Sequence, residues 1–181
     1  ENDTEITSKE EYVNAHLRIV EDIYTRSGEI FESDVTIKGR GNSTWSLPKK
    51  PYALKFDKKT SLLGEPKDKS WVLLANYTDK TNLRNEASFF MGRISNLEWT
   101  PRTHFVELFM NEVYCGTYQL CEKIKIADSR VSITDDGYLM KIDQPDRIGP
   151  EAISFKTKNL TFCVKDPDIE KNGERHKWIS D

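Results

Sequence analysis

The chain has 181 residues, of which 36% are hydrophobic and 31% charged, and its formal net charge is −3 at pH 7. This length suits one domain with a sizeable core, and this charge gives no field that would attract nucleic acid or an anionic membrane. No apolar run approaches the roughly 20 residues of a membrane helix, so we expect neither a membrane span nor a nucleic-acid partner. The three cysteines, Cys115, Cys121 and Cys163, lack metal-ligand spacing and lie in apolar stretches, which favours buried small hydrophobic residues.

The first half of the chain predicts strands joined by loops. Residues 1–11 are polar, and we expect them to be frayed. Four short segments alternate in polarity or are continuously apolar, as is typical of strands: residues 16–20, 34–38, 52–56 and 71–75. Val35 and Ile37 fall on one face of the second segment, and Leu54 and Phe56 on one face of the third.

A helix is predicted from near Thr78 or Asp79, with Asp79 as its N-cap, to near Asn96. Its apolar residues recur at helical spacing and form one face: Leu83, Ala87, Phe90 and Ile94. Two long strands follow at residues 104–110 and 114–122, joined by a tight turn at Asn111 and Glu112.

The last third of the chain gives weaker patterns. Short strands are predicted at residues 138–142, 153–155 and 160–164. The Asp-Pro-Asp run at residues 166–168 predicts the start of a helix that continues to the chain end. Together these elements predict an α+β fold, a mostly antiparallel sheet with one central helix.

The most informative segment for function is residues 37–45 (IKGRGNSTW), which follows a predicted strand. Its two glycines allow a sharp turn and a close approach of backbone to a ligand, and successive N–H groups can form an anion-binding nest. Lys38 and Arg40 would add positive charge for a phosphate. Composition alone leaves two readings open, a structural turn and a phosphate loop.

Lys55 lies on the strand that returns from this loop, on the same face as Ala53. In nucleotide kinases, a strand lysine after a glycine loop pairs with phosphate oxygens and with a helix glutamate. Glu86 could supply that carboxylate, and Arg84 could reach a phosphate. The alternative for all three residues is ordinary solvent-facing polarity.

Glu122 falls on the same face of its predicted strand as Tyr118 and Leu120, so its carboxylate needs a partner. A structural ion pair and a role as a ligand to a base, a cation or a lysine are both open. The four tryptophans would also permit sugar stacking, although core packing is their commoner use.

Residues 38–45 (KGRGNSTW) and 48–52 (PKKPY) strongly resemble the CotH kinase family, which is named after spore coat protein H. Further blocks agree with that family: residues 69–77, 83–85, 99–102, 105–108, 116–124 and 137–143. The resemblance spans about residues 12–181, which we therefore expect to form one CotH-like domain after the frayed segment 1–11.

The resemblance implies a fold distantly similar to the N-terminal lobe of a protein kinase. It also implies transfer of phosphate from ATP, with Mg or Mn, to Ser or Thr of a protein substrate, and an extracytoplasmic location (secreted, periplasmic or cell surface). By analogy, nine residues are expected at the nucleotide and its phosphates: Lys38, Gly39, Arg40, Gly41, Asn42, Ser43, Lys55, Arg84 and Glu122.

The sequence departs from the family after residue 143. The family's Asn-x-Asp run and its Trp-Asp-Phe-Asp-like metal motif are not found in residues 143–181. A kinase needs a catalytic-loop Asp and a metal-binding Asp, so we assign no catalytic or metal residue. We expect a nucleotide-facing portion, cut before the catalytic aspartates and inactive alone, whose partner is the missing C-terminal half. The face left uncovered predicts a tendency to dimerise. The alternative is a non-catalytic surface adhesion or scaffolding module with the same fold.

Overall fold

The computed structural model describes residues 5–20, 30–134 and 136–180. The chain divides into two compact units, Glu1–Ile124 and Lys125–Asp181. Among the described residues, no helix is long and apolar enough to cross a membrane.

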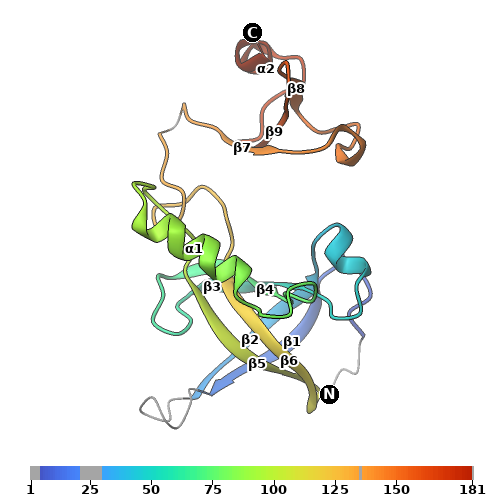
Figure 1. The fold of residues 1–181 in the computed structure, drawn as a ribbon, viewed down its shortest axis with the longest axis vertical. Helices are drawn as coiled ribbons and strands as arrows, with labels where there is room; N and C mark the ends of the chain where they lie inside the picture. The colour runs from blue at the N-terminus through green and yellow to red at the C-terminus, as the bar shows by residue number, and fades with distance from the viewer. Residues whose placement is uncertain (1–4, 21–29, 135, 181) are drawn as a thin grey trace. The chain divides into compact units, whose positions relative to one another are not determined.

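The first unit is built on a six-stranded, fully antiparallel sheet with the strand order β1-β2-β3-β4-β6-β5 (Figure 1). Its strands are β1 (Val13–Val20), β2 (Ile30–Gly39), β3 (Tyr52–Thr60), β4 (Asp68–Leu74), β5 (Thr103–Met110) and β6 (Val113–Glu122). The loop between β2 and β3 contains a short 3-10 helix, η1 (Ser43–Ser46), and the helix α1 (Arg84–Ile94) connects β4 to β5. The strands predicted from alternation in this half of the chain are thereby confirmed.

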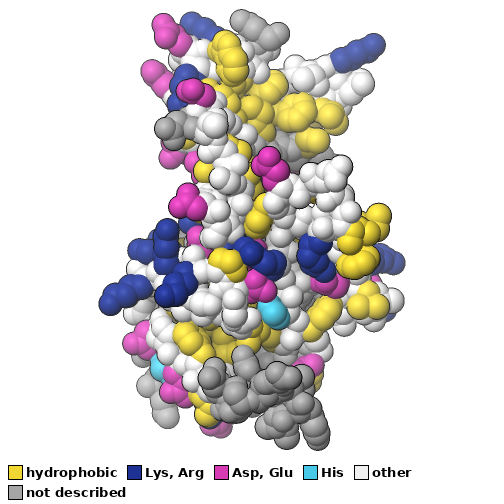
Figure 2. Space-filling view, turned by 90° about the vertical axis from the view of Figure 1, so that its left-hand side faces the viewer, with side chains coloured by type: hydrophobic (Ala, Val, Ile, Leu, Met, Phe, Trp, Pro, Cys, Tyr) yellow, Lys and Arg dark blue, Asp and Glu magenta, His cyan; other side chains and the backbone are white. Residues whose placement is uncertain are grey.

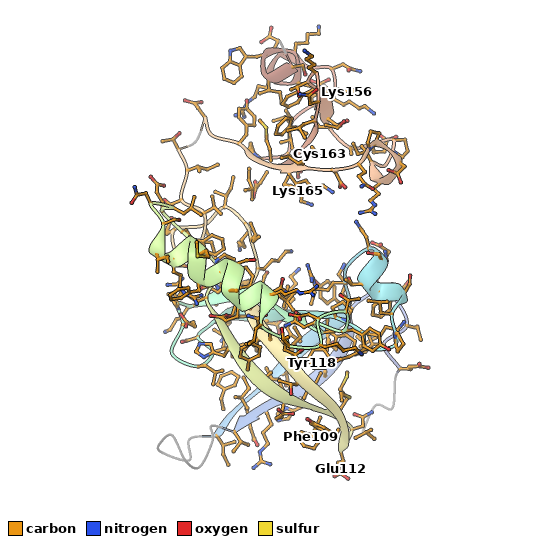
Figure 3. The ribbon with its side chains drawn as sticks, viewed as in Figure 1. Phe109, Glu112, Tyr118, Lys156, Cys163 and Lys165 are labelled. Carbon is orange, nitrogen blue, oxygen red and sulfur yellow. The ribbon has the colours of Figure 1, made fainter. Side chains whose placement is uncertain are left out.

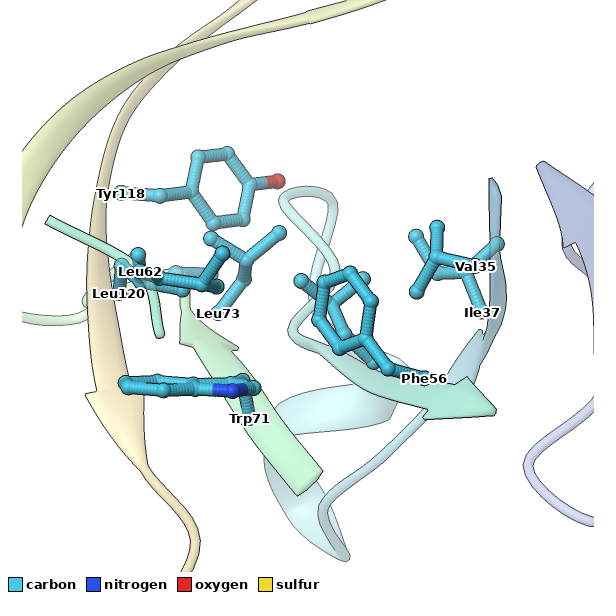
Figure 4. Close-up of a cluster of buried hydrophobic side chains, with 10 residues drawn as sticks. Val35, Ile37, Phe56, Leu62, Trp71, Leu73, Tyr118 and Leu120 are labelled. Atoms are coloured by element: carbon cyan, nitrogen blue, oxygen red, sulfur yellow. The ribbon is translucent and has the colours of Figure 1, made fainter. Parts of the chain in front are cut away.

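One face of this sheet, called the core face below, carries the main hydrophobic core. Its buried residues come from β2, β3, β4 and β6, from Leu62 in the β3–β4 loop and from Ala75 just after β4. In Figure 4, Phe56 lies in the middle of the group, with Val35 and Ile37 to one side and Trp71 and Leu120 to the other. Alternation explains the pattern, because every second residue of a strand points to the same face.

The opposite face, called the outer face below, is the one over which α1 lies. Three strand residues that alternate with core residues point to it, namely Ala53, Lys55 and Val72. α1 reaches this face through Glu86, whose carboxylate accepts hydrogen bonds from Thr103 on β5 and Gln119 on β6.

The predicted start of the helix was wrong, because α1 begins at Arg84. The chain before it forms turns, and Asn82 has a φ of 58°, a left-handed conformation that interrupts a helix. Leu83, not Asp79, occupies the N-cap position, but the Asp79 carboxylate accepts a hydrogen bond of 2.7 Å from the amide of Arg84, the first residue of the helix. The apolar face that the spacing predicted is present, but its largest side chains are more than half exposed: Leu83, Phe90 and Ile94.

The β5–β6 hairpin turns at Asn111 and Glu112, as predicted, and both residues have positive φ, 48° and 67°. Positive φ at both central positions suits the right-handed twist of a two-residue hairpin. Glu112 lies at the tip of the hairpin, with Phe109 close to it (Figure 3).

The second unit is smaller and contains a three-stranded antiparallel sheet with the order β7-β9-β8. Its elements are β7 (Leu139–Ile142), the 3-10 helix η2 (Pro145–Arg147), β8 (Ser154–Lys156), β9 (Thr161–Asp166) and α2 (Glu174–Ser180). The three predicted strands are confirmed. The helix predicted from residues 166–168 is wrong, because β9 continues to Asp166 and α2 begins only at Glu174.

All three cysteines are free thiols. Cys121 and Cys163 are buried, as the apolar context of each predicted, whereas Cys115 is only partly buried. Figure 3 shows Cys163 within the small sheet of the second unit.

Candidate functional site

A row of small, mostly apolar side chains crosses the outer face of the large sheet. The strand register places Lys38 beside Ala53, Ala53 beside Val72, and Val72 beside Cys121. Ala53, Val72 and Cys121 are buried, although none of them belongs to the main core on the other face. The row therefore forms an apolar floor that begins at a lysine and ends near α1.

Two lysines stand at the β2–β3 end of this floor and share one aromatic partner. The ammonium of Lys38 lies 4.6 Å from the centre of the Tyr12 ring, and that of Lys55 lies 5.8 Å from it. Lys38 also donates a long hydrogen bond of 3.4 Å to the carbonyl of Glu10. Burial raises the pKa of Tyr12 above its ordinary value, so its ring faces the two cations in the neutral form.

Arg40, two residues after Lys38, is a third cation at this end of the sheet, and its side chain is partly buried. Its amide donates to the Pro51 carbonyl at 3.1 Å, which continues the β2–β3 pairing past the end of the strands. Burial lowers the pKa of its guanidinium, and the nearby thiol of Cys121 opposes that change. Within the described part of the chain, its side chain has no ion pair and no hydrogen bond. A half-buried guanidinium without an acidic partner is a ready site for an anion.

The glycine loop itself is held tightly. The amide of Gly39 donates to the Ser8 carbonyl at 2.9 Å, and a Cβ on Gly39 would lie 2.3 Å from the Trp45 ring. Gly41 has a φ of 91°, which favours glycine, and the side chains of Asn42 and Ser43 are exposed. Since the amides of Gly39 and Arg40 are already used, any backbone contact to an anion would come from Gly41 onward.

A buried polar network lies at the opposite end of the floor, beneath α1. Gln119 is fully buried and accepts a hydrogen bond of 3.1 Å from Asn76. It donates to Glu86 at 3.0 Å and to Thr103 at 3.1 Å. Glu86 is also paired with Arg93 on its own helix. Burial opposes ionisation of Glu86, but the hydrogen bonds from Thr103 and Arg93 outweigh it and lower its pKa.

The structure does not form the predicted bridge between Glu86 and Lys55. The carboxylate of Glu86 is occupied by Arg93, Thr103 and Gln119. Lys55 is exposed and contacts the ring of Tyr12 instead. Lys38 and Lys55 are thus brought to the same face of the sheet, at the Tyr12 ring. Glu86 lies at the other end of the floor.

Two further expected site residues are placed elsewhere. Arg84 is largely exposed, at the first turn of α1, and its guanidinium lies 3.7 Å from Asp79. Glu122 points to the core face, where it is fully buried and accepts hydrogen bonds from the amide and the guanidinium of Arg102, at 3.0 Å and 2.7 Å. Of the alternatives for Glu122, the structure shows the structural ion pair. The register separates it from the cations, because Trp71, opposite Glu122, lies in the core.

Sequence reasoning missed the floor and Tyr12. Alternation in residues 52–56, 71–75 and 118–122 contains the signal for the floor, because it assigns Ala53, Val72 and Cys121 to one side of their strands. Only the register shows that they are neighbours. Tyr12 was missed because it lies in the polar segment before β1, where no periodicity assigns a role.

The described residues contain no group of three or more His, Cys, Asp or Glu side chains that could hold a metal ion. The site therefore consists of cations, an apolar floor and a polar network.

Comparison with known protein families decides the relationship. The family described as CotH kinase protein matches residues 37–180, which is more than half of the chain. The chain belongs to the CotH kinase family. Comparison with curated proteins gave no match. All nine residues expected at the nucleotide lie inside the span that matches the CotH family, whereas Tyr12 and β1 precede it.

Proposed function

We propose that this CotH-family chain is the nucleotide-binding part of an atypical Ser/Thr protein kinase. The observation that carries the proposal is the half-buried guanidinium of Arg40, which has no acidic partner in the described structure and lies two residues after Lys38, the lysine that shares the Tyr12 ring with Lys55. Because the chain belongs to the CotH kinase family, we propose that these cations bind the phosphates of ATP. On this proposal the first unit corresponds to a kinase-like N-terminal lobe.

Each part of the site then has its own role in binding the nucleotide. Arg40, Lys38 and Lys55 neutralise phosphate charge, and the exposed loop residues after Gly41 lie close to the same oxygens. Ala53 and Val72 provide an apolar surface for a flat base. ATP would come with Mg or Mn, but the described residues offer no metal cluster, so we assign no ligand to the metal.

The remaining elements of the proposal come from the family. Its members use a protein substrate, and we propose an extracytoplasmic location for this chain.

An alternative function, a non-catalytic adhesion or scaffolding module, is favoured by one observation. The side chains of Leu83, Phe90 and Ile94 on α1 are more than half exposed, which is typical of a surface that binds another protein.

A thermal-shift titration with ATP, with and without Mg or Mn, tests the nucleotide proposal. A ligand that binds only the folded state raises the melting temperature, and saturation at 100 times Kd stabilises by about 2.7 kcal/mol. We expect a shift for the wild-type chain that is lost in Arg40→Ala and in Lys55→Ala. Lys59→Ala is the matched control, because Lys59 is exposed and lies further along the same strand.

The melting temperatures without ATP show whether each variant is folded. If the wild-type chain shows no shift at millimolar ATP with either metal, the nucleotide proposal fails and the binding-module alternative gains support. A shift that survives in both Arg40→Ala and Lys55→Ala would place the nucleotide away from this group of cations.

A further inference from the structure

A cavity of about 950 Å³ lies in the first unit, away from the floor of the nucleotide site. Its apolar lining belongs to the core face of the sheet: Leu17, Val35, Ile37, Leu54, Leu73, Leu108 and Met110. Val35, Ile37 and Leu73 from this lining are visible in Figure 4. The volume is in the range of pockets that bind specific ligands.

The cavity is bordered by both edge strands of the sheet. β1 contributes Val13, Ala15 and Leu17, and β5 contributes Leu108 and Met110. These are the first and last strands in the order, so within the described structure no further strand pairs with the outer side of either. An edge strand presents a row of unpaired N–H and C=O groups, which is a template for another extended chain.

The cavity also reaches round the free edge of β1. Successive residues of a strand point to opposite faces, yet Asn14 and His16 line the cavity together with Ala15. The polar residues of this rim carry a net negative charge. Glu5, Asp34 and Asp57 line the cavity, and Lys50 is the one lysine among the described lining residues. Asp34 is almost fully exposed and lies 3.0 Å from the ring nitrogen of His16.

We propose that this cavity binds an extended peptide segment, with alternating apolar and basic residues, as an added strand on the edge of β1. The backbone of the peptide pairs with the free edge, its apolar side chains enter the apolar lining, and its basic side chains stand on the outward side, from which they extend across β1 towards Asp34. Main-chain hydrogen bonds then supply affinity and the alternate side chains supply specificity.

The lining argues against a fatty acid as the occupant. An aliphatic chain would fill the apolar part but leave the edge of β1 without hydrogen-bond partners from the ligand. Its carboxylate would also meet three acidic residues and a single lysine, which is unfavourable. A basic peptide meets both requirements, because it can donate and accept along the strand and its charge is complementary to the rim.

Fluorescence anisotropy with a labelled, capped heptapeptide of alternating lysine and valine tests the proposal. Two matched peptides serve as controls, one with glutamate in place of lysine and one with proline in place of the central valine, which cannot donate a backbone hydrogen bond. We expect binding of the lysine–valine peptide only, together with slower hydrogen exchange of the β1 amides in its presence.

A charge-reversal variant of the protein is the second test of the proposal. Asp34→Lys is expected to weaken peptide binding at least about tenfold, since it replaces attraction with repulsion at the rim. Glu32→Lys is the matched control, because Glu32 is an exposed acid on the same strand that does not line the cavity. Its affinity is expected to stay within about twofold of the wild type.

Several results would overturn the proposal. They are a failure of the lysine–valine peptide to bind at millimolar concentration, equal binding of the proline peptide, equal effects of Asp34→Lys and Glu32→Lys, and binding that leaves β1 unprotected. Displacement of the peptide by dodecanoate at a lower concentration than the peptide itself requires would identify a lipid site instead. None of these readouts involves ATP, so they are independent of the nucleotide proposal.

Discussion

Gly39 is a residue at which the loop of the candidate site leaves no room for a side chain. A Cβ at this position would lie 2.3 Å from the ring of Trp45. Gly39→Ala is therefore expected to lower the free energy of unfolding by about 1–3 kcal/mol, the usual effect of overpacking. Urea denaturation measures this change. Gly149→Ala is the control, because nothing lies within 4 Å of a Cβ there, and its change is expected to stay within about 0.5 kcal/mol.

Glu86 makes stability depend on pH. Burial opposes its ionisation, but hydrogen bonds from Thr103 and Arg93 lower its pKa below the ordinary value of 4.5. A carboxylate with a lowered pKa stabilises the fold above its unfolded pKa, and this contribution is lost as pH falls through the folded value. The melting temperature of the wild-type chain should fall as the pH drops below about 4.5, and that of Glu86→Gln should fall less.

Melting curves recorded from about pH 7 to about pH 3 compare the two chains. Glu107 also has a lowered pKa, chiefly because Tyr114 donates a hydrogen bond to it, so the dependence is reduced rather than abolished in Glu86→Gln. Parallel curves for both chains would show that the Glu86 network does not contribute in this range.

At the scale of elements, α1 and the residues that flank it present an apolar stripe without a partner in the described structure. The exposed fraction exceeds one half for Leu83, Phe90, Met91, Ile94 and Leu97. In the view of Figure 2, hydrophobic side chains reach the surface between groups of lysine and arginine side chains. Exposed apolar surface of this kind favours association.

We expect the chain to self-associate at micromolar concentration and the double variant Phe90→Ser and Ile94→Ser to be monomeric. Sedimentation velocity measures the outcome. Ser88→Ala, an exposed change on the same helix, should behave as the wild type does. A wild-type chain that sediments as a clean monomer would contradict the expectation.

At the scale of the whole molecule, the two units differ in how much they bury. In the described part of Lys125–Asp181, only Arg130 and Cys163 are buried, whereas the first unit holds an extended core. Local opening costs least where few apolar contacts are made. Amides of β7, β8 and β9 are expected to exchange with solvent at lower urea concentration than those of β4 and β6.

Native-state hydrogen exchange followed by mass spectrometry measures this difference. Simultaneous exchange of both sheets would mean that the two units unfold as one cooperative body.

The strands were predictable from sequence because alternation is a local property that the hydrophobic pattern records directly. The start of α1 was not, because residues between Asn76 and Leu83 combine helical spacing with turns held by Asp79. The cation group at Lys38 and Arg40 was predictable from composition. Glu122 lies apart from these cations because its side chain points to the core face of the sheet, opposite Trp71. Its partner, Arg102, is twenty residues away in the sequence, so no local pattern indicates the pair.

The order of the strands has a consequence for how the molecule assembles. β1 to β4 pair in chain order, and β5 pairs with β6 as a hairpin, so a single long-range seam of four residue pairs joins β4 to β6. Closing this seam is the step with the largest sequence separation, and such steps are slow. Val72 and Cys121 face each other across it. The apolar floor therefore exists only after the seam has closed, so a ligand that binds this floor, as we propose for ATP, would bind only chains in which β4 and β6 have paired.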